Sequence, residues 1–484
     1  MPLTSISPID GRYAKSTKPL AQFFSEQALM RYRIIVEGEY LIALSEHAEI
    51  HAELKRGNKR GSKSTFRKLS EKEKKLIRSL YNLSPNDAQI ISDIELKGYK
   101  NIKATEHDVK AVEYYLKDKL SNTSLKNVLE WVHFGLTSED TNNLAYALMI
   151  KDGISTLIMP KIENVIEQID KLAIKHSSLP MLARTHGQSA SPTTFGKEFK
   201  IFAERLKKYS QILKNLRITA KLNGATGNYN AHMAAFPKID WIKFSQKFIH
   251  NLNNLPLSNK KLITNHLSLI TNLHTTQIEP HDSYIEIFDC LRRINTILID
   301  FNQDIWRYIS DEWIVQKTVA GSVGSSTMPH KINPIKFENS EGNLGLANAY
   351  FEFFARKLPI SRLQRDLSDS TVERNFGTAL AHCLIAYDYL LKGLSKIKID
   401  EKKVRDDLNK HPEVIAEAIQ TILRREGAAM PYEKLKDLTR GKQISLTDIH
   451  KFIDGLDVPS AVKKELKKIT PLNYTGLAAK LANM

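Results

Sequence analysis

Two long runs of apolar residues with heptad spacing limit the folds that this 484-residue chain can adopt. In the first run the steps alternate between four and three: Phe195, Phe199, Phe202, Leu206, Tyr209, Leu213 and Leu216. The second run has the same rhythm: Tyr284, Ile287, Leu291, Ile294, Leu298, Phe301, Ile305 and Tyr308. This spacing predicts two helices that each carry one continuous apolar seam.

The second run also predicts a long helix. No Gly or Pro interrupts residues 283–320, and Ser283 with Glu286 has the pattern of a capping box. We therefore expect a single helix of about 40 residues from Ser283 to Ala320. The first helix is expected to start at Ser191-Pro192. Helices of this length must bury their seams against one another, within the chain or between chains.

Strand patterns are rare, so the sequence predicts an all-α fold with a long central helix bundle. Few segments show the alternation of Val, Ile and Thr that is typical of a half-buried strand. The length and the Gly and Pro breaks indicate three helical domains. They are residues 1–126, residues 127–391 with the long bundle as the oligomer core, and residues 392–484.

Composition excludes several classes of protein. Cys290 and Cys383 are the only cysteines, and both lie in helical patterns, so we expect small core residues without a disulfide framework or a metal cluster. We find no leading basic-then-apolar segment and no uncharged apolar run long enough to span a bilayer. The expectation is a soluble, cytoplasmic protein with no membrane partner.

The formal net charge of +17 makes a nucleic-acid partner worth considering. Much of the excess lies between Lys55 and Arg78, where Lys and Arg are dense. This segment has few aromatic residues that could stack on bases, and it matches no nucleic-acid module. We interpret it as a solvated insertion or helix face and expect no nucleic-acid partner. A basic field also attracts a substrate that carries a phosphate and two carboxylates.

The densest polar motif is residues 321–334, which read Gly-Ser-Val-Gly-Ser-Ser-Thr-Met-Pro-His-Lys-Ile-Asn-Pro. Gly321 and Gly324 permit backbone angles that other residues resist, and the hydroxyls of Ser325 and Ser326 follow at once. This pattern is typical of a mobile loop that leads into a helix.

The end of the motif predicts a helix start. Asn333 has the pattern of a cap and Pro334 that of a first helical residue, and the helix is expected to continue through residues 337–354 and to bury Leu344 and Leu346. Backbone N–H groups at such a start, together with a lysine, suit a carboxylate or a phosphate.

A second helix start falls in residues 104–118. Thr105 has the pattern of a cap, which places His107 and Asp108 in the first turn of the helix. An anionic group would meet the positive end of the helix dipole there. The cluster is therefore a candidate binding site for an anion.

Two further clusters carry hydroxyls and a histidine. In residues 134–143, Thr137 or Ser138 begins a helix. In residues 182–194, His186 lies on a loop rich in hydroxyls, where a histidine can titrate near neutrality and exchange protons. Metal-binding spacings such as HExxH are absent from the sequence, so no metal site is expected.

Together these motifs resemble the fumarase/aspartase superfamily, whose members eliminate fumarate from a succinyl group. The signature there reads roughly Gly-Ser-Ser-x-Met-Pro-x-Lys-x-Asn-Pro. This chain has His330 before Lys331, which is similar to the adenylosuccinate lyases. Argininosuccinate lyases usually carry Gln and fumarases Gly at that place. Among the adenylosuccinate lyases, the resemblance is nearest to the bacterial type. The resemblance spans nearly the whole chain in several motifs in the right order, and the segment near 51–80 has no clear counterpart.

The resemblance implies a fumarase/aspartase-like fold and a carbon–nitrogen lyase of purine nucleotide biosynthesis. Such an enzyme eliminates fumarate from adenylosuccinate, giving AMP, and from SAICAR, giving AICAR. It implies Ser325 as the general base and His186 as the general acid, with no metal and no organic cofactor. The substrate-binding residues that it implies are Arg12, Tyr13, Glu106, His107, Asp108, Thr137, Ser138, Gln277, Ser326, Lys331, Ile332, Asn333, Asn339, Arg365, Ser370, Thr371 and Arg374.

The family resemblance also implies an assembly, because three chains of a homotetramer build each site in those enzymes. Three alternatives stay open at this point. Ser326 could take the proton in place of Ser325. A different fumarate-releasing lyase would act on a substrate without a phosphate. A non-enzymatic structural protein could use the same fold, as a relative of argininosuccinate lyase does in some eye lenses.

Overall fold

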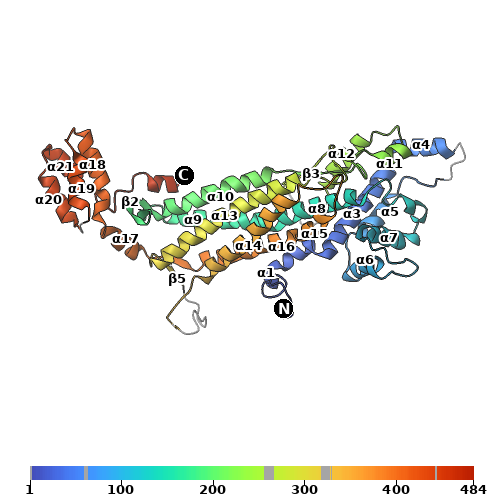
Figure 1. Ribbon diagram of the computed structural model, residues 1–484, viewed down its shortest axis with the longest axis horizontal. Helices are drawn as coiled ribbons and strands as arrows, with labels where there is room; N and C mark the ends of the chain where they lie inside the picture. Colours follow the sequence, from blue (N-terminus) through green and yellow to red (C-terminus); the bar gives the residue numbers. More distant parts are fainter. Residues whose placement is uncertain (1–2, 59–63, 256–265, 318–327, 329, 442–443) are drawn as a thin grey trace. The chain divides into compact units, whose positions relative to one another are not determined.

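The computed structural model describes residues 3–58, 64–255, 266–317, 328, 330–441 and 444–484 (Figure 1). Helices dominate these residues, as the sequence predicts, and the strands among them are short and form three two-stranded sheets. The chain divides into two compact units. Unit 1 comprises Met1–Lys161, Ser210–Asn295 and Asn343–Ile385, and unit 2 comprises Ile162–Tyr209, Thr296–Gly342 and Ala386–Met484.

Unit 1 holds the N-terminal helices and one parallel strand pair. Its elements are α1 (Ala14–Thr17), η1 (Lys18–Leu20), α2 (Ala21–Phe24), α3 (Glu26–Glu46), α4 (Ala48–Asn58), α5 (Glu71–Ser79), α6 (Pro85–Leu96), α7 (Asp108–Ser121), η2 (Lys126–Trp131), α8 (Ser138–Gly153), the π-helical turn η3 (Ile154–Ile158), β3 (Ile218–Ala220), α11 (Asn230–Ala235), α12 (Trp241–Leu252), β4 (Leu269–Thr271) and α15 (Ser368–Glu373).

Unit 2 holds two antiparallel strand pairs and the C-terminal helices. Its elements are β1 (Pro180–Thr185), β2 (Gln188–Thr194), β5 (Ile314–Gln316), β6 (Ile397–Ile399), α17 (Glu401–Asn409), η4 (Pro412–Ile415), α18 (Ala416–Arg425), α19 (Pro431–Thr439), α20 (Leu446–Asp454), α21 (Ser460–Lys467) and α22 (Ala478–Ala482). Longer helices contribute residues to both units: α9 (Met159–Lys175), α10 (Phe195–Asn215), α13 (Asp282–Ser310), α14 (Ile335–Lys357) and α16 (Phe376–Leu394).

Helices α3 and α8 lie side by side and form the core of unit 1 (Figure 1). Both helices are buried on most of their circumference, so their polar side chains need partners inside the protein. The Tyr32 hydroxyl donates to Asp152 Oδ2 at 2.8 Å, and the Thr141 hydroxyl donates to Glu37 Oε1 at 2.7 Å. These hydrogen bonds across the helix pair fix the register of α8 on α3.

A fully buried ion pair joins α8 to two connecting segments. The Lys221 ammonium lies 2.9 Å from Asp140 Oδ1, and both side chains are 0% exposed. The same ammonium donates to the carbonyls of Gly224 (2.9 Å) and Gln277 (2.8 Å). The Asp140 carboxylate also accepts the backbone N–H groups of Thr137 (2.9 Å) and Gly224 (3.1 Å). One buried pair therefore holds the start of α8 and the segments around Gly224 and Gln277.

The two predicted apolar seams are largely buried within the chain. On α10 the buried members are Phe195, Phe199, Phe202, Leu206 and Leu213, and on α13 they are Tyr284, Ile287, Leu291, Ile294, Leu298, Phe301 and Ile305. In unit 2 the Phe301 ring of α13 lies 5.2 Å from the ring of Phe202 and 6.1 Å from that of Phe199 on α10. In unit 1 the ring of Phe288 on α13 contacts those of Phe351 and Phe376.

The predicted length of the second helix was wrong. Helix α13 has 29 residues and ends at Ser310, because the backbone turns at Glu312, whose φ of +62° is left-handed. The next residues pair as a strand: Ile314 lies opposite Ile399 of β6. The predicted capping box was also wrong. Helix α13 begins at Asp282, and the Ser283 hydroxyl bonds Thr219 Oγ1 at 2.8 Å.

Two smaller predictions also need correction. Ser191 and Pro192 lie within strand β2, and the following helix α10 starts at Phe195. On α14 Leu344 is buried as predicted, but Leu346 is 52% exposed. The helix start was wrong because strand β2 stays paired with β1 up to Thr194. The burial of Leu346 was wrong because sequence spacing does not say which face of a helix a neighbouring segment covers.

Several cations of the basic segment pair with acids. Arg67 makes a bidentate contact with Glu73 at 2.7 and 2.9 Å, and Arg78 lies 2.7 Å from Glu39. The Lys74 ammonium contacts the carboxylates of Glu46 and Glu71. Pairing of this kind supports the interpretation of these residues as a helix face rather than a free cationic patch.

Cys290 and Cys383 are both buried, as predicted. Among the residues that the structure describes, no helix is both long and apolar enough to cross a membrane.

Removing the buried ammonium should destabilise the protein strongly. Lys221→Met leaves the Asp140 carboxylate without its cation in a dry environment, which typically costs about 3–5 kcal/mol of stability. We expect a loss of that size in the free energy of unfolding, measured by urea denaturation.

Lys207→Met is the matched control for this prediction. Lys207 is a partly exposed lysine that contacts Asp170 (3.2 Å) and Glu204 (2.9 Å), so its removal should cost no more than about 1 kcal/mol. Equal losses in the two variants would contradict the central role of Lys221.

Candidate active site

The predicted site residues are distributed over both units. Unit 1 holds Arg12, Tyr13, Glu106, His107, Asp108, Thr137, Ser138, Gln277, Arg365, Ser370, Thr371 and Arg374. Unit 2 holds His186, Lys331, Ile332, Asn333 and Asn339. Ser325 and Ser326 lie outside the described residues.

His107 caps helix α7 and reaches Ser138 at the start of α8. Its Nδ1 accepts the backbone N–H of Lys110 at 3.3 Å, so His107 is the cap that the sequence assigned to Thr105. The prediction failed because the chain turns at Glu106, whose φ of +48° is left-handed, and the Thr105 hydroxyl donates to the His107 carbonyl instead. His107 Nε2 lies 3.3 Å from Ser138 Oγ, which brings two predicted substrate-binding residues together.

Asp108 links two arginines. Its Oδ2 lies 2.7 Å from Arg33 Nη2 and 2.9 Å from Arg374 Nη2. Arg33 is buried and its Nε donates to Asn142 Oδ1 at 2.9 Å, so Asp108 is anchored to α3 and α8. Burial alone would raise the pKa of Asp108, but the charge and hydrogen bond of Arg33 outweigh it and hold the pKa below its ordinary value.

A buried charged network adjoins Ser138. Arg365 Nη2 lies 3.2 Å from Glu139 Oε2, and His281 Nε2 lies 3.2 Å from Glu373 Oε1. Burial raises the pKa of the Glu139 carboxyl, and the negative charge of Glu373 adds to that shift. Burial would lower the pKa of His281, but the hydrogen bond and charge of Glu373 outweigh it and raise the pKa to about 9. The Arg365 guanidinium is therefore paired with the Glu139 carboxylate, which follows the predicted binding residue Ser138 in the sequence.

The N-terminus of α8 brings the predicted binding residues Thr137 and Ser138 close to Gln277. The helix begins at Ser138 with Thr137 as its N-cap, as predicted, and the Thr137 N–H donates to Asp140. Gln277 is held close by because its carbonyl accepts from Lys221, and its side-chain amide donates to Ala225 O at 3.2 Å. The free N–H groups and the positive dipole end of a helix favour a carboxylate or a phosphate.

The remaining residues of unit 1 lie on the N-terminal turn and around α15. Arg12 is exposed on a turn that closes through the Tyr13 N–H and the Pro8 carbonyl at 2.8 Å. Ser370 and Thr371 lie within α15, and Arg374 follows its last residue. A cavity of about 430 Å³ opens beside Arg374, and its polar lining includes Asp10, Thr17, Lys18, Ser25 and Thr378.

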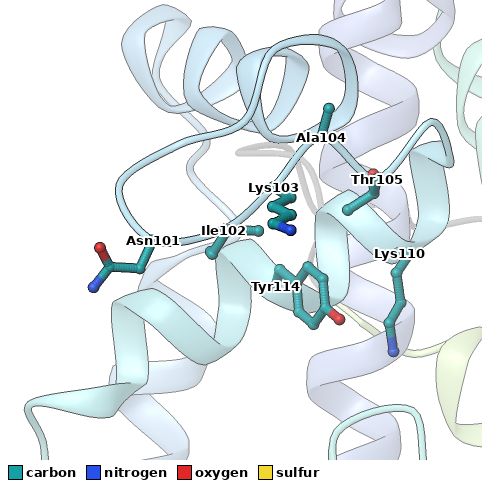
Figure 2. Close-up of a pocket in the computed structure, with 7 residues that line it drawn as sticks. All are labelled: Asn101, Ile102, Lys103, Ala104, Thr105, Lys110 and Tyr114. Carbon is teal, nitrogen blue, oxygen red and sulfur yellow. The ribbon is translucent and has the colours of Figure 1, made fainter.

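A second cavity, also of about 430 Å³, lies against helix α7 (Figure 2). Figure 2 shows Lys103 and Thr105 from the preceding loop beside Lys110 and Tyr114 from the helix. The seven residues that line it in the described chain include two lysines and no carboxylate, so an anion suits this cavity. None of the predicted site residues lines it.

In unit 2, His186 lies at the tip of a β-hairpin. Strands β1 and β2 pair antiparallel up to Thr185 opposite Gln188, which leaves His186 and Gly187 as a two-residue turn. Both turn residues have positive φ, +53° and +75°, as a type I′ turn requires. The sequence predicted a loop here, and the Gly-containing pair between two short runs was the signal for the hairpin. The His186 side chain is exposed at this tip.

Strand β5 and a local turn hold the end of the motif at residues 321–334. Gln316 Nε2 donates to the Ile332 carbonyl at 3.0 Å, and the Lys331 N–H donates to the Met328 carbonyl at 3.0 Å. Helix α14 starts at Ile335, one residue after the predicted position. Asn333 precedes the helix and Asn339 lies in its second turn.

Contacts with α13 hold the first turns of α14. The Trp306 indole donates to Glu338 Oε1 at 3.2 Å, and Asn302 Nδ2 donates to Ser340 Oγ at 3.1 Å. Lys331, which is exposed, and the asparagines after it therefore lie next to a helix whose position is well fixed.

Sequence reasoning missed three residues of the site. Arg33 and Glu26 hold Asp108 and Arg374, and Glu139 holds Arg365. Arg33 and Glu26 lie in an ordinary helical pattern, and nothing in the local sequence marks them as partners of distant residues. Glu139 follows Ser138 directly within the motif at residues 134–143, and that position was the signal that could have found it.

Family comparisons cover nearly the whole chain. The family model described as Lyase matches residues 11–348, and the one described as Adenylosuccinate lyase C-terminal matches residues 361–475. Adenylosuccinate lyase of Vibrio cholerae is 47% identical over 482 residues, which are 99% of this chain and 98% of that protein. The enzyme of Escherichia coli K12 is 45% identical over 477 residues (98% and 97%), and that of Dictyostelium discoideum is 46% identical over 484 residues (98% and 97%).

Solved structures agree on the fold. The 3-carboxy-cis,cis-muconate lactonizing enzyme of Pseudomonas putida has a TM-score of 0.68 at 18% identity, covering 96% of this chain and 95% of that chain. Fumarate lyase of Mesorhizobium sp. BNC1 has the same TM-score and identity, with 96% of both chains covered. At 18% identity these two structures support a shared fold and nothing more. The sequence relatives go further, and they show that this chain belongs to the adenylosuccinate lyase family.

Proposed function

We propose that this chain eliminates fumarate from adenylosuccinate, releasing AMP, and from SAICAR, releasing AICAR. The supporting observation is the cluster in unit 1 that links Arg374 to Asp108, His107 to Ser138 and Arg365 to Glu139 at the start of α8. Arginine forks and a helix N-terminus suit a ligand that carries a phosphate and carboxylates. Relatives named adenylosuccinate lyase align over almost the full length of the chain.

The reaction requires one base and one acid. The base removes a proton from Cβ of the succinyl group, and the electron pair of that C–H bond becomes the double bond of fumarate. The C–N bond breaks, its electron pair stays on nitrogen, and the acid supplies the proton that nitrogen needs. Ser325 is the proposed base and His186 the proposed acid, with Lys331 and Asn333 binding the carboxylate that takes up the carbanion charge.

The other predicted residues are proposed to hold the nucleotide and the second carboxylate. Arg12, Tyr13, Arg365 and Arg374 would bind the phosphate, with Ser370 and Thr371 beside them. Thr137, Ser138 and His107 would bind a carboxylate at the start of α8. Further substrate contacts are assigned to Glu106, Asp108, Gln277, Ser326, Ile332 and Asn339.

We also infer that the protein is a cytoplasmic homotetramer whose sites combine residues from several chains. Within each chain we infer three domains, divided at residues 126 and 391. Because the heptad seams are buried within the chain, the assembly surface must lie elsewhere. Leu346 (52% exposed) and Phe353 (47% exposed) lie seven residues apart on α14 and so share a face. An exposed apolar face on a long helix favours packing against a helix of a second copy.

Fumarate release is the direct test of the proposed reaction. The purified protein should release fumarate from adenylosuccinate and none from argininosuccinate or aspartate, which lack the phosphate that Arg365 and Arg374 would bind. Ser325→Ala should lower kcat by about 10²–10⁴-fold, because a positioned base contributes that much.

Two further serine variants in the motif at residues 321–334 test which serine is the base. Ser322→Ala is the matched control and should retain activity, since Ser322 has no proposed role. If Ser326→Ala abolishes turnover while Ser325→Ala does not, Ser326 is the base. A folded protein that turns over none of the three compounds would overturn the proposed function.

The assembly can be tested at the exposed face of α14. Leu346→Glu places a charge in the proposed interface and should give a smaller particle by light scattering, with loss of fumarate release. Ile242→Glu is the control, because Ile242 is similarly exposed on α12 at 49%. Normal activity in a stable monomeric Leu346→Glu variant would refute shared sites.

A further inference from the structure

Arg374 is already occupied by carboxylates of its own chain. Its Nη1 donates to both carboxylate oxygens of Glu26, at 2.6 and 2.7 Å, and its Nη2 donates to Asp108 at 2.9 Å. The Nη1 hydrogens are both directed at Glu26, so an end-on fork of Nη1 and Nη2 on a phosphate requires the Glu26 carboxylate to leave.

The two carboxylates differ in how firmly they are held. Asp108 is fixed by the buried Arg33 at 2.7 Å and accepts the backbone N–H of Val109 at 2.8 Å. Glu26 is the first residue of α3, and its side chain is 63% exposed. Glu26 is therefore the partner that can move into solvent at little cost, while Asp108 keeps Arg374 in place.

The space next to this ion pair can receive a ligand. Arg374 lines the cavity of about 430 Å³ between the N-terminal segment and the start of α16. Ser25, which precedes Glu26 and caps α3, lines the same cavity. Lys18 and Thr378 add a cation and a hydroxyl to its wall. A ligand phosphate that enters this cavity therefore reaches a wall that Arg374 forms.

We propose that Glu26 is a placeholder counter-ion that the substrate phosphate displaces from Arg374, and that this exchange favours phosphorylated nucleotides over nucleosides. The proposal rests on the proposed function, in which Arg374 binds the phosphate. A phosphate dianion replaces the Glu26 carboxylate on the same fork. A nucleoside has no group that can do so and leaves the ion pair closed.

The size of the effect follows from the exposure of the pair. An exposed ion pair stabilises by up to about 1 kcal/mol, which corresponds to about fivefold in a binding constant. Glu26→Gln keeps the shape of the side chain but removes its charge, and with it the competition for Arg374. Binding of a phosphate-bearing ligand should tighten by about three- to fivefold, while binding of the nucleoside should not change.

Calorimetric titration of the full-length protein with AMP and with adenosine tests this. Glu26→Gln should lower the dissociation constant of AMP and the KM for adenylosuccinate by the same factor, with no change for adenosine. In an Arg374→Gln background the additional Glu26→Gln change should have no effect, since the shared partner is gone. Glu465→Gln is the matched control, because Glu465 makes a comparable bidentate contact with Arg425 at 2.7 and 3.1 Å in unit 2.

The outcomes distinguish a failure of the proposed role of Glu26 from a failure of the proposed function. Unchanged or weaker AMP binding by Glu26→Gln, with normal AMP binding by the unmodified protein, would overturn the role of Glu26 and leave the proposed function standing. A shift of the same size in Glu465→Gln, or one that persists without Arg374, would also overturn it. Failure of the unmodified protein to bind AMP at all would count against the proposed function itself.

Discussion

The contact on which much of unit 1 depends is the buried pair of Lys221 and Asp140. A charged pair without water contributes to stability only if every remaining donor and acceptor finds a partner, and here the partners are backbone groups of three separate segments. The segments around Thr137, Gly224 and Gln277 are therefore held in place by hydrogen bonds to the ammonium and the carboxylate. The residues that they hold, Thr137 and Gln277, are predicted to meet the substrate.

Local periodicity predicted the helices well, but not their ends. The seams of α10 and α13 were visible because apolar spacing is a property of neighbouring residues. The end of α13 at Ser310 was not, because no Gly or Pro marks it, and the strand that follows exists only through its pairing with β6, more than 80 positions along the chain. The β1–β2 hairpin was missed for a related reason, since its strands are short and polar near the turn.

In the candidate site, too, local motifs identified individual residues but not their partners from distant parts of the sequence. Motifs in the sequence pointed to His107, Ser138, Arg365 and Arg374, and the structure joins each of them to a neighbour within unit 1. Their partners could not be predicted, because Arg33 lies 75 positions from Asp108 and Glu26 lies 348 positions from Arg374. Charge pairing across such separations leaves no pattern in a single sequence.

The two-residue turn that carries His186 restricts how this segment can change length in evolution. Most loop tips accept insertions, because nothing downstream depends on their exact length. In a hairpin, an extra residue that shifts the strand pairing by one position moves the side chains of β2 to the opposite face. Ser189, whose hydroxyl lies 3.2 Å from His411 Nδ1, would then point away from its partner. Insertions and deletions between Thr185 and Gln188 should therefore be rare among functional descendants of this chain, even though the tip itself is exposed to solvent.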